Sequence, residues 1–190
     1  MNDFTRNNTP DHTRLAGISL ILGGARSGKS RFGERLALGL DDNPVYLATA
    51  EIRDEEMRER IDLHKRDRSD NWTTLEEPLE IADKIAGQGT MVIDCLTLWL
   101  SNLMERERDV KKETERFVNA LGQSQGNVIM ISNETGLGIV PDNALARTFR
   151  DQAGRLNQRV AEVADNVIFM AAGLPMVLKK NGEPIWGDYM

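Results

Sequence analysis

Four residues of one short segment have the types and the spacing that nucleotide phosphates require. In "LGGARSGKS", Gly23, Gly28, Lys29 and Ser30 satisfy the pattern G-x-x-x-x-G-K-[ST], between an apolar run and a helical pattern. Glycines let such a loop turn its backbone N–H groups toward phosphate oxygens, and the helix N-terminus adds a partial positive charge. We therefore predict a P-loop in which Lys29 reaches the β- and γ-phosphates and Ser30 ligates Mg²⁺. The alternative is a glycine-rich turn without a ligand. The nucleotide-binding residues expected in this loop are Gly23, Gly24, Ala25, Arg26, Ser27, Gly28, Lys29 and Ser30.

A second acidic group is expected beside the P-loop. In "MVIDC", Asp94 follows three apolar residues, which is the setting of a carboxylate at the end of a buried strand. Such a carboxylate holds the magnesium ion of a P-loop enzyme, here predicted to act through water. Taken alone, Asp94 is equally well explained as a strand-end cap, and the P-loop favours the metal role.

The segment "ERIDLHKRDR" (59–68) contains one of the two histidines of the chain. On a helix, Arg60, His64 and Arg68 follow the spacing i, i+4, i+8 and form one stripe. The guanidinium groups can hold a polyanion by paired hydrogen bonds. They also disfavour protonation of an imidazole whose ordinary pKa is about 6.5, so it stays neutral and nucleophilic. A neutral His64 could attack the α-phosphorus of a nucleotide; the alternative is a solvated helix face.

Short apolar runs alternate with helical patterns along the chain. Expected strands cover 17–22, 45–49, the start of 91–100, 127–133 and 166–172. Expected helices cover 30–40, 54–68, most of the stretch that follows the strand in 91–100 up to about 122, and 143–164. This alternation predicts an α/β fold with a mostly parallel central sheet and flanking helices, similar to P-loop NTPases. Asn181-Gly182 predicts a C-terminal hairpin or edge strand. We expect a flexible N-terminal extension over 1–15 and one domain over 16–190.

Composition excludes several classes of function. The net charge of −6 leaves no broad basic surplus, so nucleic acid is not expected as a partner. The single Cys95 excludes an intramolecular disulfide and a multi-cysteine metal site, and its apolar surroundings predict a core residue. No run approaches the ~18 apolar residues of a membrane span. The polar N-terminus lacks a secretory signal, so we expect a cytoplasmic protein.

Several separated segments carry further signatures. They are "GGARSGKS" (23–30), "RIDLHKRDR" (60–68) followed by Trp72, "DCLTLWLSNL" (94–103), "NETGLGIVP" (133–141), "RDQAGRLNQ" (150–158) and "GLPMVLK" (173–179). Over about residues 17–180 they resemble the bifunctional adenosylcobinamide kinase/adenosylcobinamide-phosphate guanylyltransferase family of cobalamin biosynthesis. One departure is Ser69, where the family commonly has proline after the arginine that matches Arg68.

The resemblance implies two activities and a set of roles. His64 would receive GMP from GTP as a guanylyl-histidine, and adenosylcobinamide phosphate would displace it to give adenosylcobinamide-GDP. The same protein would phosphorylate adenosylcobinamide from GTP or ATP, a donor that the sequence does not decide. The resemblance implies nucleotide contacts at Thr49, Ala50, Glu51, Arg68 and Glu76, electrostatic stabilisation by Lys29 and Arg68, and a homotrimer. Asp94 is added to the nucleotide-binding residues because of its expected place beside the P-loop.

Alternatives exist for the role of the loop "NETGLGIVP" and for the reaction class of the whole chain. Gly136 and Gly138 permit backbone conformations that other residues do not adopt readily, and Glu134 follows a strand end. We expect this loop to face the corrinoid or the nucleotide, against a purely structural turn. For the whole chain, the alternatives are a P-loop kinase without a covalent intermediate and a nucleotide-sensing binding module.

Overall fold

The computed structural model describes residues 15–51 and 71–185. The predicted extension before residue 15, the predicted helix 54–68 and its residues Arg60, His64 and Arg68 lie outside this part of the chain. The strands described are β1 Ile18–Gly23, β2 Val45–Ala48, β3 Thr73–Glu76, β4 Thr90–Asp94, β5 Asn127–Asn133, β6 Asn166–Ala171, β7 Leu174–Lys180 and β8 Glu183–Pro184. The helices described are α1 Lys29–Leu38, the 3₁₀ helix η2 Ile81–Lys84, α3 Leu96–Glu105, α4 Val110–Gly122 and α5 Ala144–Val163.

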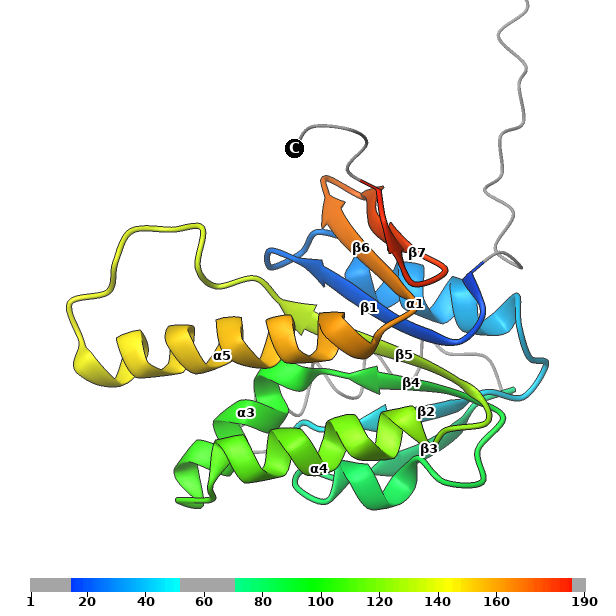
Figure 1. Ribbon diagram of the computed structural model, residues 1–190, viewed down its shortest axis with the longest axis horizontal. Coiled ribbons are helices and arrows are strands. Elements are labelled where there is room, and N and C mark those ends of the chain that lie inside the picture. Colours follow the sequence, from blue (N-terminus) through cyan, green and yellow to red (C-terminus); the bar gives the residue numbers. More distant parts are fainter. Residues whose placement is uncertain (1–14, 52–70, 186–190) are drawn as a thin grey trace, which may run out of the picture.

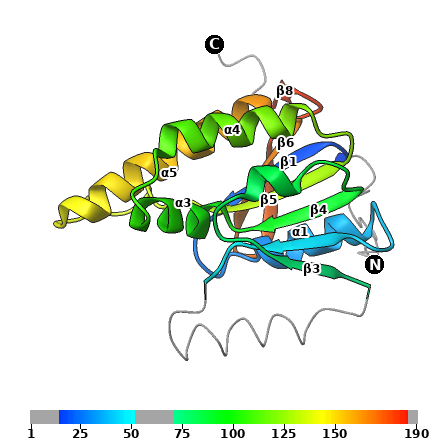
Figure 2. The same cartoon turned by 90° about the horizontal axis from the view of Figure 1, so that it is seen from below.

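The described strands form one sheet in the order β3-β2-β4-β5-β1-β6-β7-β8 (Figure 1). From β3 to β6 every neighbouring pair is parallel, whereas β7 and β8 are antiparallel additions at one edge. Helix α1 covers one face, and α3, α4 and α5 cover the other (Figures 1 and 2). The predicted α/β fold with a C-terminal hairpin is therefore confirmed.

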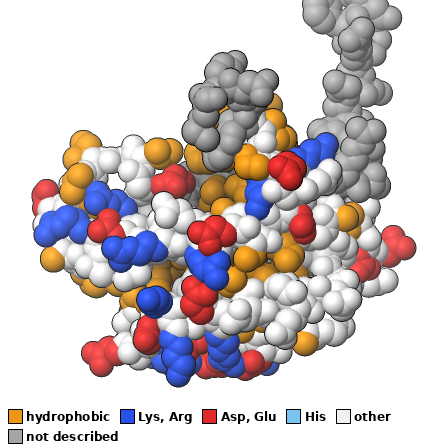
Figure 3. All heavy atoms as spheres, viewed as in Figure 1, with side chains coloured by type: hydrophobic (Ala, Val, Ile, Leu, Met, Phe, Trp, Pro, Cys, Tyr) orange, Lys and Arg blue, Asp and Glu red, His pale blue; other side chains and the backbone are white. Residues whose placement is uncertain are grey.

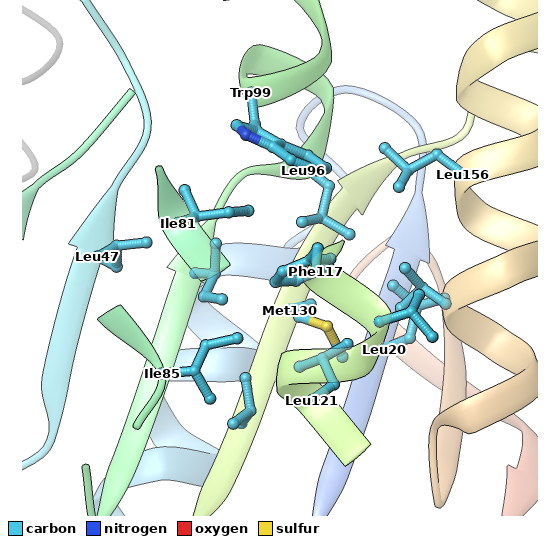
Figure 4. Packing of buried hydrophobic residues seen from close by; sticks show 14 of the residues in the cluster. Leu20, Leu47, Ile81, Ile85, Leu96, Trp99, Phe117, Leu121, Met130 and Leu156 are labelled. Atoms are coloured by element: carbon cyan, nitrogen blue, oxygen red, sulfur yellow. The ribbon is translucent and has the colours of Figure 1, made fainter. Parts of the chain in front are cut away.

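Alternation along the strands divides the core between the two faces. Leu20 belongs to the cluster under α3, α4 and α5, whereas the next residue, Ile21, belongs to the cluster under α1. The same alternation separates Met130 from Ile131 on β5. Because successive side chains of a strand point to opposite faces, an apolar run covered on both faces becomes a buried parallel strand. Figure 4 shows the larger cluster, in which Trp99 lies over the sheet.

Local signals account for the ends of several elements. Asn143 caps α5 because its side-chain oxygen accepts from the backbone N–H groups of Leu145 (2.8 Å) and Ala146 (3.2 Å). The Lys179 ammonium of β7 donates to the carbonyls of Ala161 and Glu162, both at 3.0 Å, at the other end of that helix. Among 15–51 and 71–185, no helix is long and apolar enough to cross a membrane.

The Asn181-Gly182 hairpin is confirmed, and one strand was missed. Asn181 has φ 51° and Gly182 has φ 84°, the positive angles that a two-residue turn between β7 and β8 requires. Strand β3 was not predicted from the sequence. It is four residues long, mostly exposed and rich in threonine, and it forms only by pairing in parallel with β2 at the edge of the sheet.

Candidate functional site

The predicted P-loop joins β1 to α1 at the carboxyl edge of the sheet. Gly23 ends β1 with φ 150°, and a Cβ placed there would lie 2.4 Å from the Met170 carbonyl oxygen and 2.8 Å from Ser27 Oγ. Gly28 precedes α1 with φ 94°. Both positions have a backbone angle that favours glycine, and at Gly23 a side chain would also lack space. The Gly173 N–H donates to the Ser27 carbonyl at 3.0 Å, so the turn between β6 and β7 holds the P-loop backbone in place.

The side chain of Lys29 is buried against the backbone of the P-loop. The residue is 7% exposed, and its Nζ donates to the Gly24 carbonyl at 2.6 Å and to Ser27 Oγ at 3.5 Å. Burial lowers the pKa of the Lys29 ammonium, and the negative charge of Asp94 acts against this shift. The ammonium is thus desolvated and held against the loop backbone, where it can turn to an anionic phosphate oxygen.

Asp94 ends β4, and β5 alone separates β4 from the strand that carries the P-loop. Its Oδ2 accepts from the Tyr46 hydroxyl at 2.8 Å, which orients the carboxylate. Since Asp94 acts electrostatically on Lys29, the structure brings together the two residues predicted from separate motifs.

A magnesium ion fits the oxygen donors of Ser30 and Asp94. Mg²⁺ prefers hard oxygen ligands, keeps several waters and needs one or two carboxylates together with substrate phosphates. Within the described ranges, no group of three or more His, Cys, Asp or Glu side chains could hold a metal by itself. The role of Ser30 and Asp94 toward a magnesium ion stays a prediction.

Those of the other predicted nucleotide contacts that lie in the described residues gather at the same edge of the sheet. Ala48, Glu76 and Asp94 are aligned across β2, β3 and β4, so the segment 49–51 leaves the sheet between Glu76 and Asp94. Glu51 Oε1 accepts from Arg106 at 2.8 Å. The roles of Ala50, Glu51 and Glu76 toward a nucleotide stay predictions. These residues lie on one rim of the sheet, which is formed by the segments that follow β2 and β3.

Thr49 is used within the protein itself. It is fully buried, its hydroxyl donates to the Cys95 carbonyl, and it accepts from the Cys95 N–H, both at 2.8 Å. Its own N–H donates to the Asp94 carbonyl at 3.1 Å. The Thr49 side chain therefore fixes the turn after β2, and its contact to a nucleotide stays a prediction.

Cys95 is a core residue, as predicted. It is 5% exposed, and burial raises the pKa of its thiol, as does the neighbouring Asp94 carboxylate. A neutral, enclosed thiol is a poor nucleophile.

Polar side chains of α3 were missed by the sequence interpretation. The Thr97 hydroxyl accepts from the backbone N–H of Asn133 at 3.0 Å and from its side-chain amide at 3.1 Å. Glu134, the next residue, donates its N–H to the Gly23 carbonyl at 3.0 Å. Thr97 thereby connects the end of β5 to α3 beside the P-loop. The available signal was the presence of Thr97 and Asn102 in the otherwise apolar run "CLTLWLSNL".

The loop that begins at Glu134 leads away from this edge. Together with the first half of α5 it extends beyond the rest of the described chain (Figure 1). Hydrophobic side chains are visible over this projection (Figure 3), and the large ones are exposed, with 80% for Leu137, 97% for Ile139, 58% for Val140 and 68% for Leu145. Monomeric proteins rarely expose such a group of apolar side chains, so the projection indicates an interaction surface.

Comparison with known proteins gives one consistent family. The sequence profile described as "Cobinamide kinase / cobinamide phosphate guanyltransferase" matches residues 19–178. The "Bifunctional adenosylcobalamin biosynthesis protein CobP" of Pseudomonas aeruginosa is 46% identical over 172 residues, covering 87% of this chain and 98% of that protein. The "Bifunctional adenosylcobalamin biosynthesis protein CobU" of Salmonella typhimurium is 37% identical over 180 residues, covering 84% of this chain and 98% of that protein.

Solved structures show the fold at lower identity. The flagellar accessory protein FlaH from Methanocaldococcus jannaschii matches with a TM-score of 0.53 and 16% identity, covering 96% of this chain and 88% of that chain. A solved ATPase domain matches with a TM-score of 0.51 and 15% identity, covering 90% of this chain and 79% of that chain. These likenesses show a shared fold.

Proposed function

Because the chain belongs to the cobinamide kinase / cobinamide phosphate guanyltransferase family, we propose that it carries both activities that the family name describes. It phosphorylates adenosylcobinamide from a nucleoside triphosphate, and it transfers GMP from GTP to adenosylcobinamide phosphate. The observation that carries this proposal is the P-loop with the buried Lys29 ammonium and the Asp94 carboxylate brought to one edge of the sheet.

Each described residue has a distinct task in this function. The loop from Gly23 to Gly28 offers backbone N–H groups to the phosphates, and Lys29 exchanges the Gly24 carbonyl for a phosphate oxygen. A cation there stabilises negative charge that develops during transfer. Ser30 and Asp94 would hold Mg²⁺, which would neutralise phosphate charge.

Guanylyl transfer needs a nucleophile, and we assign this role to His64, which lies outside the described residues. A ring nitrogen of neutral His64 bonds to the α-phosphorus of GTP while the bond to the bridging oxygen breaks, and pyrophosphate leaves. A phosphate oxygen of the corrinoid then attacks the same phosphorus, and the P–N bond breaks. Arg68, also outside the described residues, would stabilise the phosphates during this transfer.

The exposed projection supports an oligomeric enzyme. Leu137, Ile139 and Val140 follow closely after Glu134, whose N–H bonds to the P-loop, so this loop connects the projection to the nucleotide edge along the chain. We propose a homotrimer in which this surface contacts a neighbouring subunit. A corrinoid bound directly on the projection is the alternative.

Labelling with α-³²P-GTP tests the covalent step. We expect the wild-type chain to retain an acid-labile, alkali-stable label that His64→Ala removes. His12→Ala is the matched control, because His12 is the other histidine of the chain, and this variant should keep the label. An unlabelled wild type that still transfers γ-phosphate to adenosylcobinamide would indicate a kinase without a covalent intermediate. Tight nucleotide binding without either product would indicate a binding module.

A further inference from the structure

One face of α3 contacts both segments that form the rim beyond Asp94. Trp99, Asn102 and Arg106 follow the spacing i, i+3, i+7 and therefore share this face, with Arg106 directly after the last helical residue. Trp99 Nε1 donates to the Leu79 carbonyl at 2.8 Å, and Arg106 donates to Glu51 Oε1 at 2.8 Å. The first contact holds the chain after β3, and the second holds the chain after β2.

Asn102 is the member of this face that joins the two segments. Its side-chain amide donates to the Thr49 carbonyl at 2.8 Å and to the Pro78 carbonyl at 3.0 Å. The residue is 2% exposed, so water would not replace these bonds readily if the amide were removed. A buried carbonyl that loses its donor is destabilised, so the two backbone segments would separate or rearrange.

The segments joined by Asn102 are the ones expected to contact the nucleotide. Thr49 is followed by Ala50 and Glu51, and Pro78 comes two residues after Glu76. Thr49 is also fixed to the end of β4 through its hydroxyl and N–H. The amide thus sets the distance between the two sides of the rim, and the bonds of Thr49 set the distance from the rim to Asp94.

We propose that Asn102 is a positioning residue for the nucleoside end of GTP, a role that rests on the proposed function. It acts through Thr49 and Pro78 and does not itself touch the phosphates, which bind at the P-loop. Loss of its donor hydrogens should therefore weaken recognition of the nucleoside and leave phosphate binding intact. A residue needed merely for folding would impair both.

Asn102→Asp tests this separation, since it keeps the shape of the side chain and removes both donors. We expect the KM for GTP in formation of the guanylyl-enzyme to rise about tenfold or more, with kcat changed less than about threefold. The affinity for inorganic tripolyphosphate with Mg²⁺, measured by calorimetry, should stay within about twofold of wild type. Arg106→Ala, at an exposed position that loses the Glu51 contact, should raise the same KM by a smaller factor.

Asn166→Asp is the matched control. Asn166 is fully buried, and its amide donates to the Ala16 carbonyl and to Ser19 Oγ, both at 3.1 Å, at the amino edge of the sheet. This variant should lose thermal stability without a change in the KM for GTP. Unchanged KM in Asn102→Asp, or a parallel loss of tripolyphosphate affinity, overturns the positioning role. If Asn102→Asp does not fold, unchanged KM in Arg106→Ala overturns it. A wild type that forms no guanylyl-enzyme contradicts the proposed function instead.

Discussion

The carboxyl edge of the sheet and the projection after β5 treat their side chains in opposite ways. At the edge, polar groups such as Lys29, Thr49 and Asn102 are buried and hydrogen-bonded to backbone. On the projection, Leu137 and Ile139 are largely exposed. Burial of a polar group is unfavourable unless it is hydrogen-bonded, and the polar groups at the edge meet this condition. Exposure of apolar side chains is also unfavourable, and the projection leaves them exposed.

The difference shows which parts of the site are complete within one chain. At the edge, the side chains of Lys29, Thr49 and Asn102 all donate to backbone carbonyls of the same chain. The projection becomes favourable only when another surface covers it. The difference therefore separates two proposals, that the P-loop of one chain binds the phosphates and that the projection contacts a neighbouring subunit or the corrinoid.

The largest expected effect concerns Lys29. Lys29→Met should lower both transfer activities on the order of 10²–10³-fold, because a buried charge that stabilises the transition state is removed. Steady-state assays of both half-reactions check this result. Lys84→Met, at a half-exposed side chain paired with Glu77 at 3.6 Å, is the control and should remain active. Retained activity in Lys29→Met would remove the P-loop from the mechanism.

Two neighbouring glycines provide the next test of the edge. Gly23→Ala should lower the free energy of unfolding by roughly 2–4 kcal/mol, because its Cβ would overlap the Met170 carbonyl and the backbone angle is strained. Gly24→Ala should change it by less than about 1 kcal/mol, because no atom lies within 4 Å of its added Cβ. Urea denaturation of both variants checks the contrast, and equal losses would contradict the described loop.

The projection is tested by Ile139→Asp. If a neighbouring subunit covers this 97% exposed residue, the charge should dissociate the oligomer, as measured by light scattering with size-exclusion chromatography. Tripolyphosphate affinity should stay unchanged, because the P-loop belongs to one chain. Glu162→Gln, a charge change at an exposed position near the end of α5 and outside the projection, serves as the control. An intact oligomer with a raised KM for adenosylcobinamide would instead assign the projection to the corrinoid.

The smallest expected effect is a pH dependence at Lys29. Burial lowers its pKa in the folded chain, so the unfolded chain binds the proton more tightly. The unfavourable contribution of the buried ammonium is complete below the lowered pKa and disappears as pH rises to the ordinary value near 10.5. Lys29→Met should thus be more stable than wild type at neutral pH, and this advantage should shrink toward pH 10.5. Urea denaturation of both proteins across that range checks the sign, which would be reversed if Asp94 outweighed burial.

Much of the fold follows from local pattern. The runs that became β1, β5 and β6 are continuous and apolar because a parallel sheet covered on both faces buries nearly every residue. The helix cap at Asn143 and the turn at Asn181-Gly182 could also be predicted, since a cap and a two-residue turn depend only on residues adjacent in the sequence. Strand β3 could not be found this way, because its exposed residues form a strand only through pairing with β2.

The sequence by itself determined the chemistry of the phosphate loop, since the requirement for glycine, lysine and serine at fixed spacing is met within eight residues. The tertiary structure alone decided that the charge of Asp94 acts on Lys29 and that the Thr49 side chain bonds to the backbone after β4. It also decided that Asn102 joins the segments after β2 and β3. These contacts connect residues distant along the chain, and their partners are mostly backbone groups, which carry no sequence signal. Hydrogen bonds to backbone depend on where the chain passes, and that path is set by packing of the whole sheet.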